Sequence, residues 1–280
     1  MADEVNLNAY FERIGFVGSI APNLQTLQAL HLNHAQAIAF ENLDPLMGKV
    51  PRLDPQTLEN KLIRDRRGGW CYEQNMLFLR ALRTLGFETR TLAARAVLGR
   101  KPGSITPRNH LVLAVDLGGI NYIADVGFGG MVLTAPLRVR PDAEQETPHG
   151  VFRITGEGPE HILEARVPGD GGEWQQLYRF TLETEHEVDL EVSNWYQATH
   201  ADSFLRNTLL VERPGKGGAR HLLFNGELRT QAPGSERETR RLTTVAEMKE
   251  VLAGTFGITL PAAEQIDPVL EKFVAAASPA

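Results

Sequence analysis

The chain has 280 residues, which exceeds the usual size of one domain and predicts two or three domains. Hydrophobic residues make up 42% and charged residues 23%, so disorder is excluded for the bulk of the chain. The net charge of −6 excludes the basic surface of a general nucleic-acid binder, and no apolar stretch is long enough to span a membrane. We therefore expect neither nucleic acid nor a membrane among its partners.

The first residues and the cysteine content bear on the compartment. The N-terminus is acidic and no apolar segment follows it, which is not the pattern of a signal peptide. Cys71 is the only cysteine, so an intramolecular disulfide is excluded, and no CxxC motif is present to hold zinc. These features predict a cytoplasmic protein without a bound metal.

Residues 1–87 predict a helical bundle. Apolar residues recur at helical spacing over 7–14, and Gly15 can end that helix in the left-handed conformation. Asn23 and Asp54 are typical N-cap residues for the next two helices. The fourth helix is expected to begin at Trp70 or Cys71, directly after two glycines.

Residues 88–185 predict a β-barrel-like domain. Apolar residues alternate there with a period of two, and turn signals recur. Residues 111–115 and 120–124 flank Gly118-Gly119, which is the signature of a two-residue hairpin turn. Several short strands at this spacing favour a small barrel or sandwich.

Residues 186–280 predict a mixed α/β region. The elements expected there are a helix over 188–199, strands over 208–212 and 221–224, a helix with a capping box from Thr244, and a terminal helix capped by Asp267.

Cys71 is the first candidate for chemistry. A lone cysteine is commonly a small buried hydrophobe. Its predicted place at the start of a helix, however, favours the thiolate, because unpaired backbone N–H groups and the helix dipole lie there. Gly68 and Gly69 would also let the backbone approach a ligand closely. This pattern is typical of a cysteine nucleophile.

The predicted hairpin supplies a base for that thiol. If Gly118 and Gly119 are the turn, the numbers of paired residues sum to 237, so His110 faces residue 127. Asp125 then lies two positions away on the same face of the sheet, where it can hydrogen-bond to the imidazole and stabilise its charged form. A surface His–Asp pair without catalysis is the alternative. Because Cys71 is the only thiol and this pair could serve it as a base, we take Cys71, His110 and Asp125 as the leading candidate for a catalytic triad.

Two other groups of residues are less specific. His31 and His34 lie three apart, as metal ligands can, but no third ligand is evident and a helix surface is the preferred interpretation. Residues 127–130 (GFGG) match no nucleotide-binding fingerprint, yet they follow Asp125 and can offer backbone N–H groups to an oxyanion or a phosphate.

These motifs together resemble one enzyme family. Residues 67–75 (RGGWCYEQN) resemble the cysteine signature of the arylamine N-acetyltransferases, with Trp70 and Tyr72 where tyrosine and phenylalanine are more usual. Residues 109–110 and 125–130 resemble the histidine and aspartate motifs of that family, in the same order and at suitable spacings. Residues 10–15 and 39–43 match further segments.

The resemblance implies an α+β, multi-domain protein with a helical bundle (1–87), a β-barrel-like domain (88–185) and an α/β lid (186–280). It implies a papain-like Cys71–His110–Asp125 site that moves an acetyl group from acetyl-CoA to arylamines or hydrazines through an acetyl-cysteine. An aromatic amine suits this reaction, because its nitrogen is neutral and nucleophilic at pH 7.

The resemblance also implies roles for residues around that site. Phe40, Phe128 and Phe204 are assigned to the acceptor pocket, where rings could stack. Gly127, Gly129 and Gly130 are expected to contact the coenzyme or an oxyanion. Arg13 and Glu41 correspond to an ion pair of the family and, like Arg67, are expected to be structural. No metal is implied, and a monomer or small homo-oligomer is expected.

Three alternatives remain open from the sequence. A thioester hydrolase would use the same three residues and give the acyl group to water. A related amide synthase would accept a large acyl chain and would need a wider cleft. A non-catalytic binding module would not need a reactive thiol.

Overall fold

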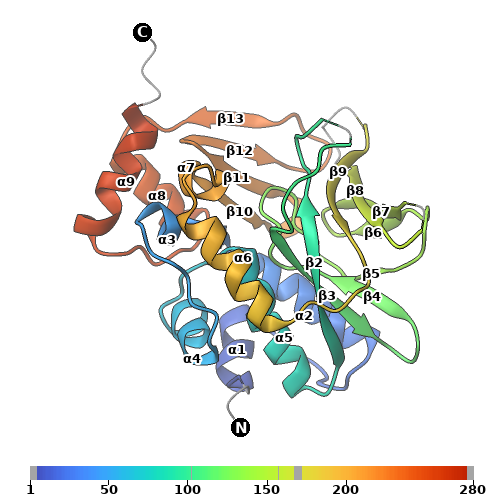
Figure 1. Cartoon of the computed structure of the whole chain (residues 1–280). Helices are drawn as coiled ribbons and strands as arrows, with labels where there is room; N and C mark the ends of the chain where they lie inside the picture. The colour runs from blue at the N-terminus through green and yellow to red at the C-terminus, as the bar shows by residue number, and fades with distance from the viewer. Residues whose placement is uncertain (1–4, 102, 157, 167–171, 276–280) are drawn as a thin grey trace.

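The computed structural model describes residues 5–101, 103–156, 158–166 and 172–275. In Figure 1 the N-terminal helices lie at the bottom, one antiparallel sheet lies at the right, and a second sheet lies at the top beside the last two helices. The fold is therefore α+β, as predicted, with helices and antiparallel sheets in separate parts of the molecule. Within the described residues, no helix is both long and apolar enough to cross a membrane.

The first region is helical, and its predicted caps are confirmed. Gly15 ends the first helix with φ +65°, and the side chains of Asn23 and Asp54 accept hydrogen bonds from the backbone of Thr26 and Thr57. The elements are α1 (Leu7–Ile14), α2 (Leu24–Ala37), α3 (Leu43–Leu46), α4 (Pro55–Leu58), the π-helical η1 (Glu59–Arg64) and α5 (Cys71–Thr84).

The larger sheet has eight antiparallel strands in the order β5-β4-β3-β2-β9-β8-β7-β6. They are β2 (Glu88–Ala96), β3 (His110–Asp116), β4 (Asn121–Ala124), β5 (Leu137–Arg138), β6 (Gln145–Thr147), β7 (Gly150–Thr155), β8 (His161–Arg166) and β9 (Gln175–Phe180). The predicted hairpin register is confirmed, because Leu113 pairs with Ala124 and both turn glycines have positive φ.

The smaller sheet has the order β1-β10-β11-β12-β13. Its strands are β1 (Phe40–Glu41), β10 (Leu210–Pro214), β11 (Arg220–Phe224), β12 (Glu227–Gln231) and β13 (Glu238–Arg241). The sequence did not indicate β1, which is only two residues long and belongs to the N-terminal region. Phe40 pairs with Glu212 of β10, so this strand joins the first and last thirds of the chain.

The remaining helices are α6 (Glu187–Thr199), α7 (Phe204–Asn207), the 3₁₀ turn η2 (Lys216–Gly218), α8 (Val245–Gly254) and α9 (Ala263–Ala275). The capping box from Thr244 to Glu247 is confirmed. The cap assigned to Asp267 is wrong, because α9 begins four residues earlier and Asp267 pairs with Lys249 at 2.9 Å.

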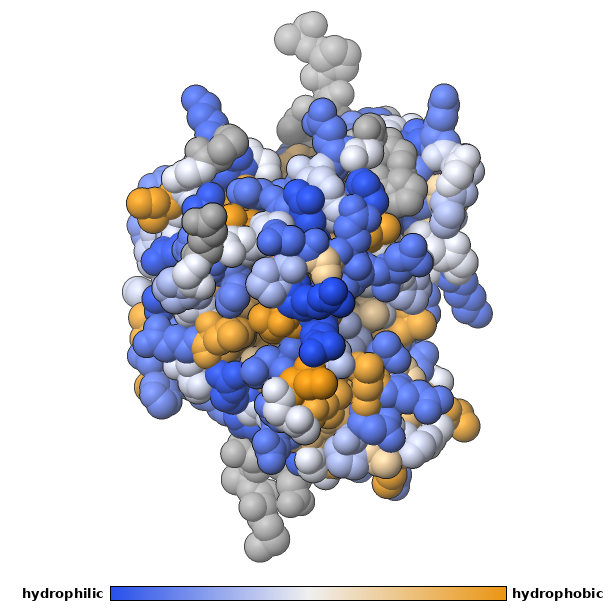
Figure 2. All heavy atoms as spheres, turned by 90° about the vertical axis from the view of Figure 1, so that its right-hand side faces the viewer, coloured by the Kyte–Doolittle hydropathy of each residue, from blue (hydrophilic) through white to orange (hydrophobic). Residues whose placement is uncertain are grey.

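Three clusters of buried apolar side chains fill the interior. One lies among the N-terminal helices and one face of β3, one lies inside the larger sheet, and one lies between the smaller sheet and helices α8 and α9. On the face shown in Figure 2, hydrophilic side chains cover most of the surface and apolar ones form small separate groups. The division of the chain at 87/88 and 185/186 stays a prediction.

Candidate active site

Cys71 is the first residue of α5, and its side chain is buried, with 4% of its surface exposed. The turn before it is fixed by Glu73, whose carboxylate accepts a hydrogen bond from the backbone N–H of Trp70 at 3.1 Å. The thiol therefore lies beside the unpaired N–H groups of a helix start, which favour negative charge there.

A network of ion pairs stabilises the segment that leads into α5. Lys61 contacts Asp44 at 2.6 Å and Glu73 at 2.7 Å, and Arg67 contacts Glu41 at 2.7 Å and Asp44 at 3.0 Å. Burial raises the pKa of Glu73 to about 7, although the charge of Lys61 acts in the opposite direction. Each carboxylate of this network has a cation partner, so the network fixes the segment that leads into Cys71.

The two glycines before Cys71 have a different use from the one expected. A Cβ on Gly68 would lie 2.3 Å from the carbonyl oxygen of Ala39, and one on Gly69 would lie 2.9 Å from a carboxylate oxygen of Glu73. The backbone therefore approaches other parts of the protein closely at these positions, rather than a ligand.

His110 begins β3, and Asp125 follows the end of β4, so the hairpin brings them together. His110 Nε2 lies 2.7 Å from Asp125 Oδ2, and both side chains are buried. The imidazole also packs between two rings, with its centroid 5.1 Å from that of Phe128 and 4.9 Å from that of Tyr178. These contacts fix the ring plane and leave Nδ1 as the nitrogen not bonded to Asp125.

Asp125 is held through both carboxylate oxygens and its backbone N–H. Its Oδ1 accepts hydrogen bonds from Asn75 Nδ2 and from the backbone N–H of Gly127, both at 2.9 Å. Its backbone N–H donates to His31 Nε2 at 3.1 Å. Burial works against the ionised carboxyl, but the charge and hydrogen bond of His110 prevail and lower its pKa.

The pKa of His110 moves in the opposite direction. Burial alone would lower it, but the Asp125 carboxylate and a further interaction with the Cys71 side chain raise it to about 10. The structure therefore favours a charged imidazolium between a carboxylate and a sulfur atom, which is the arrangement that stabilises a thiolate.

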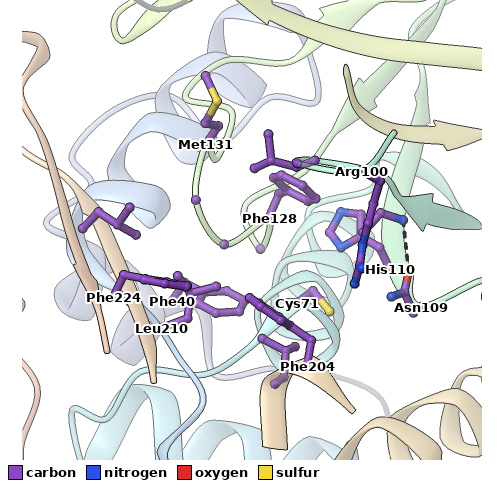
Figure 3. Close-up of a pocket in the computed structure, with 18 of the residues that line it drawn as sticks. Phe40, Cys71, Arg100, Asn109, His110, Phe128, Met131, Phe204, Leu210 and Phe224 are labelled. Carbon is purple, nitrogen blue, oxygen red and sulfur yellow. Dashed lines mark hydrogen bonds between the residues drawn. The ribbon is translucent and has the colours of Figure 1, made fainter. Parts of the chain in front are cut away.

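These side chains open onto a cavity of about 800 Å³. Figure 3 shows Cys71 and His110 facing it, with Phe40, Phe128 and Phe204 around them. Its wall combines apolar side chains with polar and cationic ones, and the charged residues that line it are Arg100, Asp202, Arg220, Arg229 and Arg237. The cavity can hold both an aromatic ring and an anionic chain.

The three predicted pocket phenylalanines come from three different parts of the fold. Phe40 lies on β1, Phe128 lies in the loop after β4, and Phe204 begins α7. Phe40 and Phe128 are almost completely buried, whereas Phe204 is 49% exposed and stacks on Phe224 with a centroid distance of 6.4 Å. The pocket is thus enclosed near Cys71 and more open at Phe204.

The glycine loop 127–130 packs directly on the site. A Cβ on Gly127 would lie 2.8 Å from Cys71 Cα, and one on Gly129 would lie 2.6 Å from the Phe40 ring. The N–H groups of Gly127 and Gly130 donate to the carboxylates of Asp125 and Glu212. Gly127 and Gly129 therefore give the loop its close approach, while the N–H groups of Gly127 and Gly130 already have acceptors.

The expected ion pair between Arg13 and Glu41 is wrong. Glu41 pairs with Arg67, whereas Arg13 donates to the backbone carbonyls of Leu62 and Ala37 at 2.8 Å. Arg13 lies in α1, and its two acceptors are a carbonyl of η1 and the carbonyl of the last residue of α2. Arg13 and Glu41 are buried and Arg67 is partly buried, and the structural role of the three stays a prediction.

His31 and His34 are buried rather than on a helix surface. His34 lies between Tyr10 and Gln74, with 2.8 Å to each, and burial lowers its pKa to about 3. His31 contacts the backbone of Asp125. This burial could not be predicted from neighbouring residues, because the hydrogen-bond partners come from distant segments.

The unusual aromatic residues beside Cys71 point away from the cavity and toward α6. The indole N–H of Trp70 donates to Asn194 at 3.1 Å, and the Tyr72 hydroxyl accepts from Gln197 Nε2 at 3.2 Å. Gln197 also donates to the carbonyl of Asn109, the residue before His110. These contacts connect α6 to both halves of the site.

Sequence reasoning missed several residues that hold the site. Asn75 donates to Asp125 and to the carbonyl of Leu111, and accepts from the N–H of Val126. Its place one helical turn after Cys71 was the available signal. Glu212 and Phe224 had no such signal, because only tertiary folding brings them to the cavity.

Comparison with known proteins agrees with this geometry. A family model described as N-acetyltransferase matches residues 23–266. The chain is 42% identical over 252 residues to the arylamine N-acetyltransferase of Escherichia coli K12, covering 90% of this chain and 88% of the relative. The chain belongs to the arylamine N-acetyltransferase family.

Solved structures of arylamine N-acetyltransferases are similar over almost the whole chain. The enzyme from Salmonella typhimurium has a TM-score of 0.88 at 38% identity, covering 96% of this chain and 98% of that one. The Mycobacterium marinum arylamine N-acetyltransferase in complex with CoA has a TM-score of 0.90 at 36% identity, covering 96% and 99%. Among the residues that our structure describes, no three histidine, cysteine or acidic side chains are arranged to hold a metal.

Proposed function

We propose that this arylamine N-acetyltransferase moves an acetyl group from acetyl-CoA to the nitrogen of arylamines or arylhydrazines, with Cys71, His110 and Asp125 as the catalytic residues. The observation that carries the assignment of these residues is the buried His110–Asp125 contact of 2.7 Å beside the only thiol of the chain, at the wall of one cavity. A base oriented by a third group beside a nucleophile is the arrangement that acyl transfer requires.

In the first step the Cys71 thiolate attacks the thioester carbonyl of acetyl-CoA. The bond between the acetyl carbon and the coenzyme sulfur breaks, and the coenzyme thiolate takes the proton of the His110 imidazolium. The products are acetyl-Cys71, neutral His110 and free coenzyme A. Asp125 keeps the imidazole in the tautomer that directs Nδ1 to the reaction.

In the second step the amine nitrogen attacks the acetyl-cysteine carbonyl. His110 takes the proton that the nitrogen loses, the carbon–sulfur bond breaks, and the Cys71 thiolate is restored beside an imidazolium. The amide product then leaves. Both steps use the same carbonyl position, so one cavity serves donor and acceptor in turn.

The composition of the cavity suits both substrates. Phe40, Phe128 and Phe204 offer rings against which an aromatic acceptor can pack. Arginines of the cavity wall, such as Arg100, suit the phosphates of a coenzyme. We assign Gly127, Gly129 and Gly130 to the coenzyme side through the shape of their loop, and the Mycobacterium marinum relative is a complex with CoA.

Burial of the site favours transfer over hydrolysis. Cys71 and His110 expose only 4% and 3% of their surface, so an acetyl group on the sulfur would be poorly accessible to water. An amide synthase that uses a large acyl chain remains the second candidate function for the same site. We also propose a cytoplasmic monomer or small homo-oligomer, divided into three domains at 87/88 and 185/186.

The test is covalent labelling of the wild type and of Cys71→Ala. We expect acetyl-CoA to add one acetyl group to the wild type, mapped by peptide mass spectrometry to Cys71, and an arylamine to remove it as the amide. The variant should gain no acetyl group while keeping its thermal stability. An acetyl group on another residue, or transfer by a folded Cys71→Ala protein, would contradict the mechanism.

A further inference from the structure

The glycine loop is held by a carboxylate at each end. At its start, the N–H of Gly127 donates to Asp125 at 2.9 Å. At its end, the N–H of Gly130 donates to Glu212 Oε2 at 2.6 Å, and the N–H of Val132 lies 3.3 and 3.4 Å from the two oxygens of the same carboxylate. Asp125 is a local neighbour of the loop, whereas Glu212 comes from β10, 82 residues further along the chain.

Glu212 is buried, and its cation partner among the residues that the structure describes is Arg220. Their side chains expose 1% and 8% of their surface, and Arg220 Nη1 lies 3.0 Å from Glu212 Oε1. Arg220 Nη2 also donates to the carbonyl of Val132 at 3.1 Å, and Arg220 donates to the carbonyl of His149 through Nε and Nη2. The pair therefore binds N–H and C=O groups of the same short segment.

Stability alone does not explain such a pair. Removing two ions from water is costly, and well-packed apolar side chains of similar size are often as stabilising as a buried ion pair. What an apolar pair cannot do is accept the N–H groups of Gly130 and Val132 or donate to the carbonyl of Val132. The distinctive effect of Glu212 and Arg220 is therefore the position of the loop.

The position of that loop decides the shape of the site. Gly127 contacts Cys71 and Gly129 contacts the Phe40 ring so closely that neither has room for a Cβ. Glu212 lies directly across from Phe40 in the pairing of β1 with β10. Glu212 holds the end of the loop, and the Phe40 ring contacts its middle. Both residues therefore belong to the same pair of strands.

We propose that Glu212, together with Arg220, is a positioning residue for acetyl transfer: it anchors the end of the 127–132 segment so that Phe128 and Gly129 keep their places beside Cys71. This inference rests on the proposed function. The pair does not touch the reacting atoms. A displacement of about 1 Å in such a site can slow a reaction by about 10²-fold.

The decisive variant is Glu212→Met/Arg220→Met, which removes both charges and all of their hydrogen bonds. We expect a moderate loss of thermal stability, because neutral N–H and C=O groups lose their partners, but a smaller loss than an unpaired buried charge would cause. Acetylation of Cys71 at saturating acetyl-CoA should nevertheless slow by about 10- to 100-fold. Amide hydrogen exchange at Gly130 and Val132 should become faster, because these N–H groups lose their acceptor.

Glu212→Gln separates positioning from stability. The amide keeps an oxygen that can accept from the N–H of Gly130, but it leaves Arg220 buried without an anion. We expect it to be less stable than the double variant and yet faster in acetylation. A purely structural role predicts the reverse order, with the rate following the stability, and that order would overturn the proposal.

Glu164→Met is the matched control. Glu164 is also a buried strand glutamate paired with an arginine, Arg153 at 2.7 Å, but it lies on β8 and makes no contact with the loop in the structure. It should lose stability without losing acetylation rate. A double variant at Glu212 and Arg220 that acetylates at the wild-type rate would refute the inference.

The same experiment distinguishes this inference from the proposed function. If wild-type Cys71 is not acetylated by acetyl-CoA, the proposed function fails whatever the variants do. Amide exchange at Gly130 and Val132 does not depend on any substrate. Unchanged exchange in the double variant would show that Glu212 does not anchor the loop, even if the enzyme is an acetyltransferase.

Discussion

The helical region and the larger sheet each supply part of the site, but they hold their reactive side chains differently. Cys71 is placed by the backbone of α5, and the start of that helix rests on the buried charges of Lys61 and Glu73. His110 is placed at a strand end, and its ring is oriented by one carboxylate, Asp125, and by aromatic neighbours.

This difference predicts whether a mutation in each region affects mainly stability or mainly rate. A group fixed by the backbone keeps its position as long as the helix is folded, so changes near it should affect stability more than rate. A group oriented by one hydrogen bond can lose its orientation while the fold persists, so changes there should affect rate more than stability. Four predictions test this contrast between Cys71 and His110.

The largest effect is expected for Asp125→Asn. The amide keeps an oxygen for the N–H groups of Asn75 and Gly127, but its NH₂ faces His110 Nε2 and favours the wrong tautomer. In a serine-protease triad the equivalent change costs about 10⁴-fold in rate. Single-turnover acetylation should fall by a similar order while the protein stays folded. Near-wild-type rates would remove Asp125 from the mechanism.

Lys61→Met should show the opposite pattern. It leaves the buried carboxylates of Asp44 and Glu73 without that cation, which costs about 3–5 kcal/mol of the free energy of unfolding. Below its melting temperature, the variant should acetylate Cys71 within severalfold of the wild type. Chemical denaturation and single-turnover rates measure both quantities.

Arg64→Met is the control for Lys61→Met. It removes an exposed ion pair with Glu59 from the same π-helical turn, and it should cost no more than about 1 kcal/mol. Equal losses in the two variants would mean that burial of the network around Lys61 has no special importance.

The third prediction concerns alkaline pH. Folding raises the pKa of His110 from 6.5 to about 10, so the folded state keeps a proton that the unfolded state has lost in this range. The stabilisation is complete below pH 6.5 and decreases as the pH rises toward 10, by on the order of 1–3 kcal/mol. Thermal melts over this range should show that slope.

Asp125→Asn supplies the comparison for the pH series. Without the carboxylate, His110 loses the largest cause of its raised pKa and keeps only the interaction with Cys71, so the variant should lose much less stability than the wild type between pH 6.5 and 10. An identical slope in both proteins would place its origin outside the His110–Asp125 pair.

The smallest effect is expected for Trp70→Phe. The ring remains, but the hydrogen bond to Asn194 is lost and a buried amide oxygen is left without a donor. The cost should be about 1–2 kcal/mol, with faster amide exchange in α6 and little change in rate. Trp195→Phe, at a 58% exposed position of the same helix, should change neither stability nor exchange.

The sequence by itself determined the parts of the site that are local. Helix caps at Asn23 and Asp54, the start of α5 at Cys71 and the register of the hairpin follow from nearby residue types, because backbone N–H groups and turn geometry act within a few residues. The register also placed His110 next to Asp125 before any tertiary contact was considered.

Only the tertiary structure decided which distant groups meet. Glu41 pairs with Arg67 and not with Arg13, His34 is buried between Tyr10 and Gln74, and Glu212 reaches the loop after Asp125 across 82 residues. Each of these contacts depends on how β1, α2 and β10 pack, and burial then removes the competing water. Local sequence patterns do not predict such packing, so the partners of a charged or polar residue cannot be predicted from its neighbours in sequence.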